Sequence, residues 1–405
     1  MKGVILAAGK GTRMGPLTEN RSKAMLPVAN RPLLEHIIVA LKASGIREIV
    51  VVTGYAGEKI QEYFKDGSRL GVHIEYIEQK EQRGTADAIA VVRDSVSERF
   101  LVTNGDMLAG IADIKTLIST GGDAVLAAKK VDVPQQYGIL YVKGHKVEKL
   151  VEKPEKSASN LANAGIYIFN PSIFDAIGNT ITSPRGEYEI TDSIQFMIDS
   201  GKNVSYAPIE KWQDIGFPWH LLEANETMLG EDEDIQWDIL GEIEPYATLK
   251  GNVSVGRGTI IRNGSYITGP VVIGNNCDIG PNCYIRSATS IGDNVRVGNA
   301  VEVKNSIVMS GTHIGHLSYV GDSIIGEGCN FGAGTKVANL RHDNRTVMVE
   351  LGGKRIDSGR RKLGVIMGDN VHTGINSLMN VGTTVAGGAC INPGEFIRGK
   401  YPGEK

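Results

Sequence analysis

The chain has 405 residues, 41% apolar and 22% charged, a composition typical of a globular protein with two or three domains. Its net charge of -3 disfavours nucleic acid and anionic lipid as partners. The N-terminal apolar run, Val4 to Ala8, is too short for a signal peptide or a membrane span, so we expect a cytoplasmic protein with no membrane partner. The 51 glycines are unusual, but 14 prolines and no Gly-X-Y period exclude collagen.

Residues 1–225 alternate β-branched runs with helical patterns. An apolar run after Gly3 is followed by an amphipathic stretch at 31–45 and a second β-branched run at 49–53. Strand, crossover helix and strand predict an α/β domain with a doubly wound parallel sheet, in which ligands bind at loops after the carboxyl ends of strands. The loop after Ala8 is therefore the first candidate site. The acidic segment 226–242 is interpreted as a solvated linker.

Glycine becomes more frequent after residue 240: the first 240 residues contain 22 of the 51 and the rest contain 29. In the same region an aliphatic residue recurs every six positions, at Ile243, Leu249, Val255, Ile261, Ile267, Ile273, Ile279, Ile285, Ile291, Val297 and Val303. One inward aliphatic side chain per short strand, with glycine at the corners, is typical of a three-sided β-helix with about 18 residues per coil. We expect residues 243–405 to form a left-handed parallel β-helix of hexapeptide repeats.

The hexapeptide repeat slips by one residue after Val303 and again before Ile325. Residues 341–361 are predicted to be a loop inserted into the stack, after which coils are expected to resume irregularly at Ile366, Val371, Val381 and Ile391. Because a lone prism leaves flat faces to bury, we expect an oligomer, and a homotrimer in particular.

The four cysteines, Cys277, Cys283, Cys329 and Cys390, all lie in the glycine-rich half of the chain. None has the close spacing of a zinc site. We interpret all four as buried reduced thiols.

Phosphate-binding features follow the first strand. Gly9 and Gly11 permit a loop whose amide groups face phosphate oxygens, and Arg13 supplies a planar cation for a polyphosphate. Alone, such a loop is also compatible with an ordinary turn. Lys23 follows shortly before a Leu-Pro pair at 26–27.

With these residues, the sequence resembles the sugar-phosphate nucleotidyltransferases, whose signature is LAAGxGTRM followed by a lysine before leucine and proline. The resemblance continues at Gln79, Gly84-Thr85, Asn104-Gly105-Asp106, Tyr137-Gly138, residues 151–154, residues 163–165 and residues 212–216. It implies a Rossmann-like domain that binds a nucleotide through Ala8, Gly9, Gly11, Thr12, Arg13, Gln79, Gly84 and Thr85. It also implies a sugar 1-phosphate site at Gly138, Glu152 and Asn163, catalytic roles for Arg13 and Lys23, and Mg²⁺ held by Asp106 and Asp214.

Two spacings in the repeat place pairs of candidate site residues on neighbouring coils. Arg286 and Lys304 are 18 residues apart, so they should stack about 4.8 Å apart and together suit an anion such as a sugar phosphate. His316 and Ala333 are 17 residues apart across one slip, which is again one coil.

The stretch 301–339 resembles the acetyltransferase domain of the bifunctional glucosamine-1-phosphate acetyltransferase and N-acetylglucosamine-1-phosphate uridyltransferase family. The resemblance implies that His316 is the general base for a sugar amine. It implies an amino-sugar phosphate site at Arg286, Lys304, Tyr319 and Asn330, and contacts with the co-substrate acetyl-CoA at Ala333, Asn339 and Ile375, the last replacing a family serine. The basic segment 354–362 suggests the hypothesis that Arg360 and Arg361 bind coenzyme A phosphates.

The expected function is bifunctional: acetyl transfer to glucosamine 1-phosphate, then uridylyl transfer to N-acetylglucosamine 1-phosphate. An alternative is a nucleotidyltransferase alone, glucose-1-phosphate specific, with the β-helix as a trimerisation or regulatory domain. The residues leave open the choice between UTP and dTTP and the identity of the sugar. A non-catalytic exchange subunit of a translation initiation factor shares the two-domain plan, but the intact loop from Gly9 to Arg13 disfavours it.

Overall fold

The computed structural model describes residues 1–231 and 235–403 and divides into two compact units. The first contains residues 1–10, 22–25 and 33–214, and the second contains residues 11–21, 26–32 and 215 onward. Helix α7 (Pro218–Glu231) belongs to the second unit, so residues 226–231 of the expected linker are helical. Residues 232–234 of that linker and the last two residues of the expected β-helix domain, 404–405, lie outside the described part.

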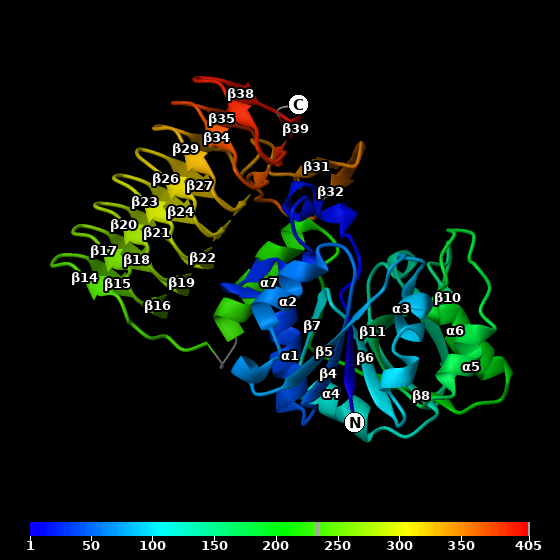
Figure 1. The fold of residues 1–405 in the computed structure, drawn as a ribbon. Helices are drawn as coiled ribbons and strands as arrows, with labels where there is room; N and C mark the ends of the chain where they lie inside the picture. Colours follow the sequence, from blue (N-terminus) through cyan, green and yellow to red (C-terminus); the bar gives the residue numbers. More distant parts are fainter. Residues whose placement is uncertain (232–234, 404–405) are drawn as a thin grey trace. The chain divides into compact units, whose positions relative to one another are not determined.

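The first unit contains a nine-stranded sheet in the order β5-β4-β1-β6-β11-β8-β12-β10-β9 (Figure 1). Its strands are β1 (Gly3–Leu6), β4 (Glu48–Thr53), β5 (His73–Glu78), β6 (Phe100–Asn104), β8 (Ala124–Lys130), β9 (Gly138–Lys143), β10 (Lys146–Glu152), β11 (Leu161–Phe169) and β12 (Val204–Pro208). The half around β1 is parallel, as predicted, but β11 runs antiparallel to β6 and β8, so the sheet is mixed. A separate pair joins β7 (Met107–Ala109) to β13 (Trp212–Asp214).

Helices cover both faces of this sheet, because alternate strand residues point to opposite sides. One buried cluster includes Val50 and Phe100 and the other includes Val51 and Leu101. The first packs with residues of α3, α5 and α6, and the second with residues of α1, α2 and α4. Their bounds are α1 (Leu33–Ala43), α2 (Gly57–Phe64), α3 (Thr85–Ala90), α4 (Ile111–Ser119), α5 (Ile173–Gly178) and α6 (Ile190–Asp199).

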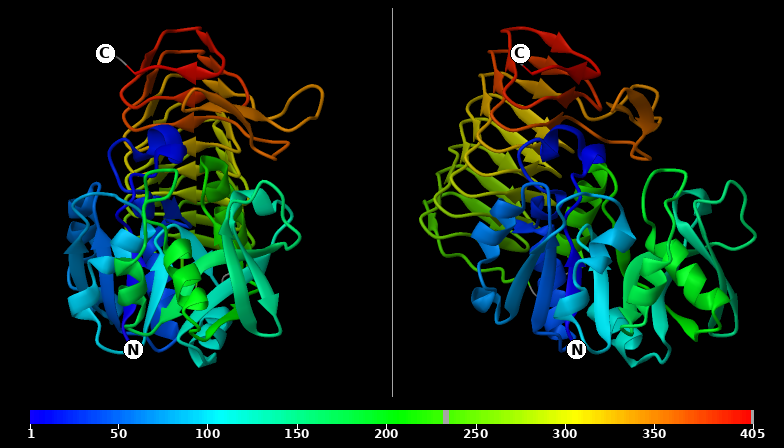
Figure 2. Two further views of the ribbon diagram at one scale, coloured as in Figure 1. Left: turned by 90° about the vertical axis from the view of Figure 1, so that its right-hand side faces the viewer. Right: turned by 45° about the vertical axis from the view of Figure 1, so that its right-hand side comes forward.

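The glycine-rich half is a parallel β-helix of three eight-stranded sheets, whose coils are seen stacked in Figure 2. The first sheet contains β14 (Glu242–Ile243), β17 (Ile260–Ile261), β20 (Asp278–Ile279), β23 (Arg296–Val297), β26 (His313–Ile314), β29 (Asn330–Phe331), β34 (His372–Thr373) and β37 (Cys390–Ile391). The second contains β15 (Thr248–Lys250), β18 (Tyr266–Thr268), β21 (Tyr284–Ile285), β24 (Glu302–Lys304), β27 (Tyr319–Gly321), β30 (Lys336–Val337), β35 (Leu378–Met379) and β38 (Phe396–Ile397). The third contains β16 (Val253–Val255), β19 (Val271–Ile273), β22 (Thr289–Ile291), β25 (Ile307–Val308), β28 (Ile324–Ile325), β33 (Ile366–Met367), β36 (Thr384–Val385) and β39 (Lys400–Tyr401). The predicted fold class, an α/β nucleotidyltransferase domain followed by a left-handed β-helix, is confirmed.

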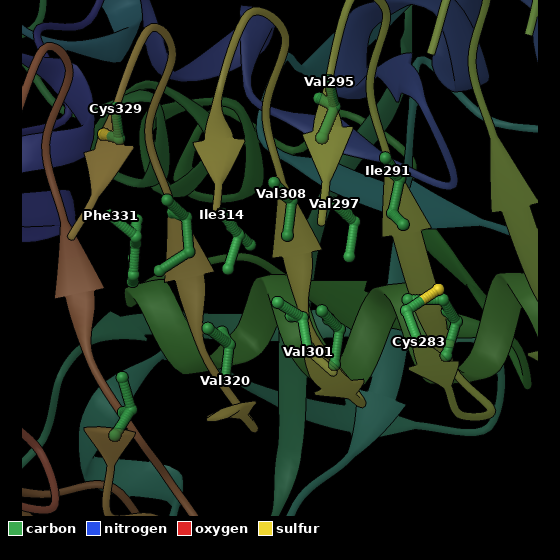
Figure 3. Packing of buried hydrophobic residues seen from close by; sticks show 14 of the residues in the cluster. Cys283, Ile291, Val295, Val297, Val301, Val308, Ile314, Val320, Cys329 and Phe331 are labelled. Carbon is green, nitrogen blue, oxygen red and sulfur yellow. The ribbon is translucent and has the colours of Figure 1, made fainter. Parts of the chain in front are cut away.

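The predicted six-residue aliphatic column is the core of the β-helix. Figure 3 shows side chains such as Ile291, Val297 and Phe331 packed together inside the coils. The expectation of irregular coils after the insertion is wrong, because the inward positions continue every six residues through Met367, Thr373, Met379, Val385, Ile391 and Ile397. The repeat is hidden in the sequence because one inward position is a threonine, whose hydroxyl is within 2.9 Å of the Gly332 amide and of Thr335 Oγ1.

Three of the four cysteines are buried in the β-helix, as predicted, but Cys390 is exposed. Burial raises the pKa of the Cys283 and Cys329 thiols to about 11, which keeps them protonated at neutral pH. Cys390 begins β37, where the inward position is taken by the next residue, Ile391. The alternation of a strand therefore places the cysteine outside.

The insertion after β30 contains a two-stranded hairpin rather than a plain loop. It is formed by β31 (Met348–Leu351) and β32 (Lys354–Asp357), and β33 then pairs with β28, so the stack continues beyond the excursion. Two other short strands, β2 (Pro27–Val28) and β3 (Arg31–Pro32), pair with each other in the second unit. No helix in residues 1–231 or 235–403 is long and apolar enough to cross a membrane.

Candidate functional site

The residues predicted to bind phosphate lie in the loop that follows β1. Ala8 is buried and its carbonyl accepts the Tyr55 amide at 3.2 Å. Gly9 is exposed, and a Cβ placed on it would meet nothing within 4 Å. Gly11 has a φ of 67°, a conformation that glycine adopts without strain. Thr12 begins the 3₁₀ turn Thr12–Thr18, and the Arg13 guanidinium lies 5.5 Å from the centre of the Phe217 ring.

A second group gathers at the end of β5. Gln79 is buried, and its side-chain Nε2 donates to the Gly84 carbonyl at 3.3 Å and to Asp87 Oδ2 at 2.8 Å. Gly84 has a φ of 118°, and an added Cβ would lie 2.5 Å from the Tyr188 carbonyl oxygen, so only glycine fits. The Thr85 hydroxyl accepts the Ile190 amide at 3.0 Å. Asp87, to which the sequence analysis assigns no role, therefore orients the Gln79 amide.

Lys23 begins the 3₁₀ turn Lys23–Met25, and the two predicted metal ligands lie at the ends of strands, Asp106 between β6 and β7 and Asp214 at the end of β13. Lys23 Nζ contacts Asp106 Oδ2 at 2.7 Å, with the lysine side chain 9% exposed and the aspartate 35% exposed. Asp214 is directly opposite Met107 in the β7–β13 pair, and Met107 is the residue after Asp106 in the sequence. Within the described residues, no group of three or more His, Cys, Asp or Glu could hold a metal. Two carboxylates suit Mg²⁺, which keeps several water or phosphate ligands.

The three predicted sugar residues are brought together. Glu152 is opposite Gly138 in the β9–β10 pair, and a Cβ on Gly138 would lie 3.0 Å from Glu152 Oε2 and 3.6 Å from Asn163 Cβ. Asn163 donates to the Tyr167 hydroxyl at 2.8 Å. Burial raises the pKa of Glu152, an effect larger than the opposing pull of nearby Lys153 and Arg185. This carboxyl therefore resists ionisation more than an exposed glutamate.

Two residues that sequence reasoning did not assign lie beside this pocket. Thr191 Cγ2 is 3.4 Å from the position of a Gly138 Cβ, and its buried hydroxyl has no protein partner in the described part of the chain. Trp212 Nε1 donates to the Ala164 carbonyl at 2.9 Å, and its ring meets Tyr137 edge-on at 5.5 Å. The Trp212 motif thus supports the strand that carries Asn163.

In the β-helix, His316 and Ala333 are neighbours on consecutive coils, as their spacing predicts. The register pairs His313 with Asn330, and the His316 carbonyl accepts the amide of Gly334 at 2.9 Å. Ile375 occupies the same corner one coil later, because Phe331 pairs with Thr373. The exposed His316 and Ile375 therefore flank Ala333 in one corner column.

Arg286 and Lys304 also stack in register, but each is neutralised by a carboxylate. The Arg286 amide donates to the carbonyl of Val303, and its guanidinium contacts Glu302 Oε1 at 2.8 Å. Lys304 Nζ contacts Asp322 Oδ2 at 3.3 Å. The expected pair of unpaired cations is thus two ion pairs side by side, and an anion bound here would meet carboxylates as well.

Tyr319 and Asn339 are in contact, whereas Asn330 lies elsewhere. Asn339 Nδ2 donates to the Tyr319 hydroxyl at 3.1 Å. Burial is the main cause that raises the pKa of Tyr319. Asn330 is on β29 of the first sheet and Tyr319 on β27 of the second, so they belong to different faces of this chain's prism. The structure does not bring Asn330 together with Lys304 and Tyr319.

One arginine of the basic insertion forms ion pairs with helix α7. Arg360 contacts Glu226 Oε1 at 2.5 Å and Glu223 Oε1 at 3.8 Å, and its side chain is 13% exposed. Arg361 is exposed and reaches Asn344 Oδ1 at 3.4 Å. Arg360 therefore connects the insertion to α7, and we expect this pairing to leave it unavailable as the hypothesised coenzyme ligand.

We expect Arg360→Ala to lower the free energy of unfolding by about 1–3 kcal/mol, because it removes charged hydrogen bonds from a largely buried group. The KM for acetyl-CoA is expected to stay unchanged. Urea unfolding and steady-state kinetics measure the two quantities, with the exposed Arg361→Ala as the matched control. A raised KM for acetyl-CoA in Arg360→Ala alone would restore the coenzyme hypothesis.

Comparisons with known proteins agree with both halves of the chain. The Nucleotidyl transferase family model matches residues 2–231, and the GMPPB C-terminal domain model matches residues 267–386. A bifunctional protein GlmU of Methanocaldococcus jannaschii is 43% identical over 376 residues, covering 93% of this chain and 89% of the relative. A bifunctional sugar-1-phosphate nucleotidylyltransferase/acetyltransferase of Sulfurisphaera tokodaii is 40% identical over 400 residues, covering 98% and 97%.

A solved structure matches a little over half of the chain. It is a putative glucose-1-phosphate thymidylyltransferase from Bacillus anthracis, 29% identical with a TM-score of 0.53, and the match covers 58% of this chain and 97% of that one. The two full-length relatives extend the likeness through the β-helix. The chain therefore belongs to the family of bifunctional sugar-1-phosphate nucleotidylyltransferase/acetyltransferases, the GlmU family.

Proposed function

We propose that the protein transfers an acetyl group from acetyl-CoA to glucosamine 1-phosphate and a uridylyl group from UTP to N-acetylglucosamine 1-phosphate, which gives UDP-N-acetylglucosamine and pyrophosphate. The observation that carries the nucleotidyl half is the contact of Lys23 with Asp106 beside the strand that holds Asp214. The observation that carries the acetyl half is the column of His316, Ala333 and Ile375 on three consecutive coils.

For nucleotidyl transfer, the sugar-phosphate oxygen attacks the α-phosphorus and pyrophosphate leaves, so two polyanions must approach each other. Lys23 and Arg13 supply positive charge toward the phosphates, and the open amide groups around Gly9 and Gly11 bind phosphate oxygens. Asp106 and Asp214 would hold Mg²⁺, which neutralises charge on the phosphates. The attacking phosphate is already ionised, so no general base is required.

Two groups of residues in the first unit are assigned to the nucleobase and to the sugar. Gln79, Gly84 and Thr85 form the base-reading group, in which Asp87 fixes the direction of the Gln79 amide. Glu152 accepts sugar hydroxyl hydrogens and Asn163 both donates and accepts.

For acetyl transfer, His316 takes a proton from the sugar ammonium, and the amine nitrogen so freed attacks the thioester carbonyl carbon. The C–S bond then breaks, and coenzyme A leaves as a thiol by taking up a proton. Ala333, Asn339 and Ile375 contact acetyl-CoA, while Arg286, Lys304 and Tyr319 hold the amino-sugar phosphate. Asn330 lies on another face of the same prism. A homotrimer would supply it from a neighbouring copy, and exposed Tyr266, Tyr284, Leu378 and Phe396 follow one sheet that suits such packing.

A product analysis tests both halves of this proposal. The protein is incubated with Mg²⁺, acetyl-CoA, and panels of sugar 1-phosphates, UTP and dTTP, and the products are identified by mass, with the oligomer size measured by light scattering. An acetylated glucosamine phosphate and a UDP-sugar are the expected products. Nucleotide sugar without acetylation of any amino sugar would favour the nucleotidyltransferase-only alternative.

We expect Glu152→Gln to raise the KM for the sugar 1-phosphate by about tenfold, because a charged acceptor is lost. In the wild type this KM should rise as the pH falls through the raised pKa of Glu152, because protonation removes the acceptor at a higher pH than for an ordinary glutamate. The Gln variant should show no such step. Initial rates between pH 4.5 and 8 give this KM for both proteins. The same rise in KM at low pH in both proteins would exclude Glu152 as the group that causes it.

A further inference from the structure

Asp322 is a buried carboxylate that no part of the expected chemistry uses. It follows β27 at a corner of the β-helix, and its side chain is 2% exposed. Asp322 and Asn305, which lies one coil earlier, have φ values of 51° and 45°. Asparagine and aspartate tolerate this left-handed conformation better than most residues, so the corner alone would accept either.

Three side-chain donors converge on this carboxylate. Asn305 Nδ2 donates to Oδ1 at 2.8 Å, and Oδ2 accepts Asn339 Nδ2 at 2.5 Å and Lys304 Nζ at 3.3 Å. A buried charge is tolerated only when it is paired and hydrogen-bonded, and this one has both kinds of partner. Two of the three donors, Lys304 and Asn339, are residues that we assign to the acetyl site.

The network reaches a third residue of that site through Asn339, which also donates to the Tyr319 hydroxyl at 3.1 Å. Gly321 leaves the space that this contact needs. A Cβ on Gly321 would lie 2.5 Å from the Tyr319 hydroxyl and 2.7 Å from Asn339 Nδ2. Both atoms are the far ends of side chains, so an added methyl group would displace them without obstructing the backbone.

Asn305 connects the hydrogen-bond network around Asp322 to helix α7. Asn305 Nδ2 also donates to Glu226 Oε1 at 2.7 Å, and Glu226 in turn accepts Arg360. The amide group of Asn305 is therefore held between two carboxylates, which fixes the direction from which it meets Asp322.

We propose that Asp322 is a positioning residue for acetyl transfer, which holds Lys304 and, through Asn339, Tyr319 toward the amino-sugar phosphate, and Asn339 itself toward the acetyl donor. This inference rests on the proposed acetyltransferase function. Without the carboxylate, Lys304 has no fixed direction and the Asn339 amide loses its strongest acceptor. Displacements of about 1 Å at such groups cost up to about 100-fold in rate.

Asp322→Asn tests the proposal, because it keeps the volume and the corner conformation but turns an acceptor-only group into one that also donates. The kcat/KM for acetylation of glucosamine 1-phosphate is expected to fall about 10- to 100-fold, with a rise in the KM for the sugar phosphate of about tenfold. Nucleotidyl transfer by the same preparation is expected to stay within twofold. The control is Asp278→Asn, which removes another carboxylate of the β-helix, paired with Arg262 at 2.6 Å and outside the network.

Gly321→Ala is the second variant, since it keeps the Asp322 charge and displaces only Tyr319 and Asn339. It should lower acetyl transfer about tenfold and leave the midpoint of thermal unfolding close to that of the wild type. Unchanged acetylation kinetics in a folded Asp322→Asn protein would overturn the proposal. If Asp322→Asn does not fold, unchanged kinetics in Gly321→Ala would overturn it instead. Failure of the wild type to acetylate any amino sugar would contradict the proposed function itself.

Discussion

Asp106→Asn is expected to reduce nucleotidyl transfer by at least about 10³-fold, because the change removes two effects at once. The carboxylate is one of only two that we assign to Mg²⁺, and it also holds Lys23 Nζ at 2.7 Å. The asparagine amide is a poor ligand for a hard cation and leaves the mostly buried lysine without its counter-charge. Asp214→Asn should give a smaller loss, since it removes only the metal ligand.

Release of pyrophosphate from UTP and N-acetylglucosamine 1-phosphate, followed over a range of Mg²⁺ concentrations, measures this effect. Acetyl transfer by the same protein is the internal control for folding, and Asp94→Asn, at an exposed position, is the matched substitution. High Mg²⁺ should recover part of the Asp214→Asn activity, because weaker binding is offset by concentration. If Asp106→Asn retained more than a tenth of the rate, the assignment of Asp106 as a ligand would be wrong.

His316→Ala is expected to lower the rate of acetyl transfer by about 10²–10⁴-fold, the usual contribution of a positioned general base. The histidine is exposed at a corner and is adjacent on the next coil to Ala333, so its loss should not disturb the packed interior. Nucleotidyl transfer is therefore expected to remain at the wild-type rate. The remaining activity should rise with pH, because a larger fraction of the sugar amine is then already deprotonated.

Formation of free coenzyme A from acetyl-CoA and glucosamine 1-phosphate measures the loss. His342→Ala, which removes an exposed histidine of the insertion, is the control. Wild-type acetyl transfer in His316→Ala would mean that another group takes the proton. Absence of acetyl transfer in both the variant and the wild type would leave the β-helix as a trimerisation or regulatory domain.

Much of the fold could be predicted because each half has a strong local rule. The six-residue column from Ile243 to Val303 has one inward position per strand, and the structure places these side chains inside the coils. The rule became unreadable after the insertion, since Met367, Thr373 and Met379 replace the aliphatic residues. The antiparallel β11 was missed because strand direction depends on pairings between residues far apart in sequence, which periodicity does not report.

The sequence predicted which residues of the acetyl site stack on neighbouring coils, but not which carboxylates pair with the cations among them. The stacking of Arg286 with Lys304 and of His316 with Ala333 follows from counting residues per coil. Their partners do not, because Glu302 and Asp322 are ordinary acidic residues until the register brings them beside a cation. For Asp322 the sequence did contain a signal, since it lies 18 residues, about one coil, after Lys304. Glu302 is 16 residues from Arg286, which is not a whole coil, so counting residues would not have found that pair.

The insertion between β30 and β33 shows which changes of length this architecture tolerates. The hairpin β31–β32 leaves the stack and the chain returns to pair with β28, so every later column keeps its place. An excursion of any length that returns to the same corner is neutral to the prism, as is the gain or loss of one whole coil at its end. A change of two or three residues within a coil would instead rotate every later side chain to another face. Length variation in this half of the protein is therefore expected at the corners and at the end of the stack, where the columns of the acetyl site stay aligned.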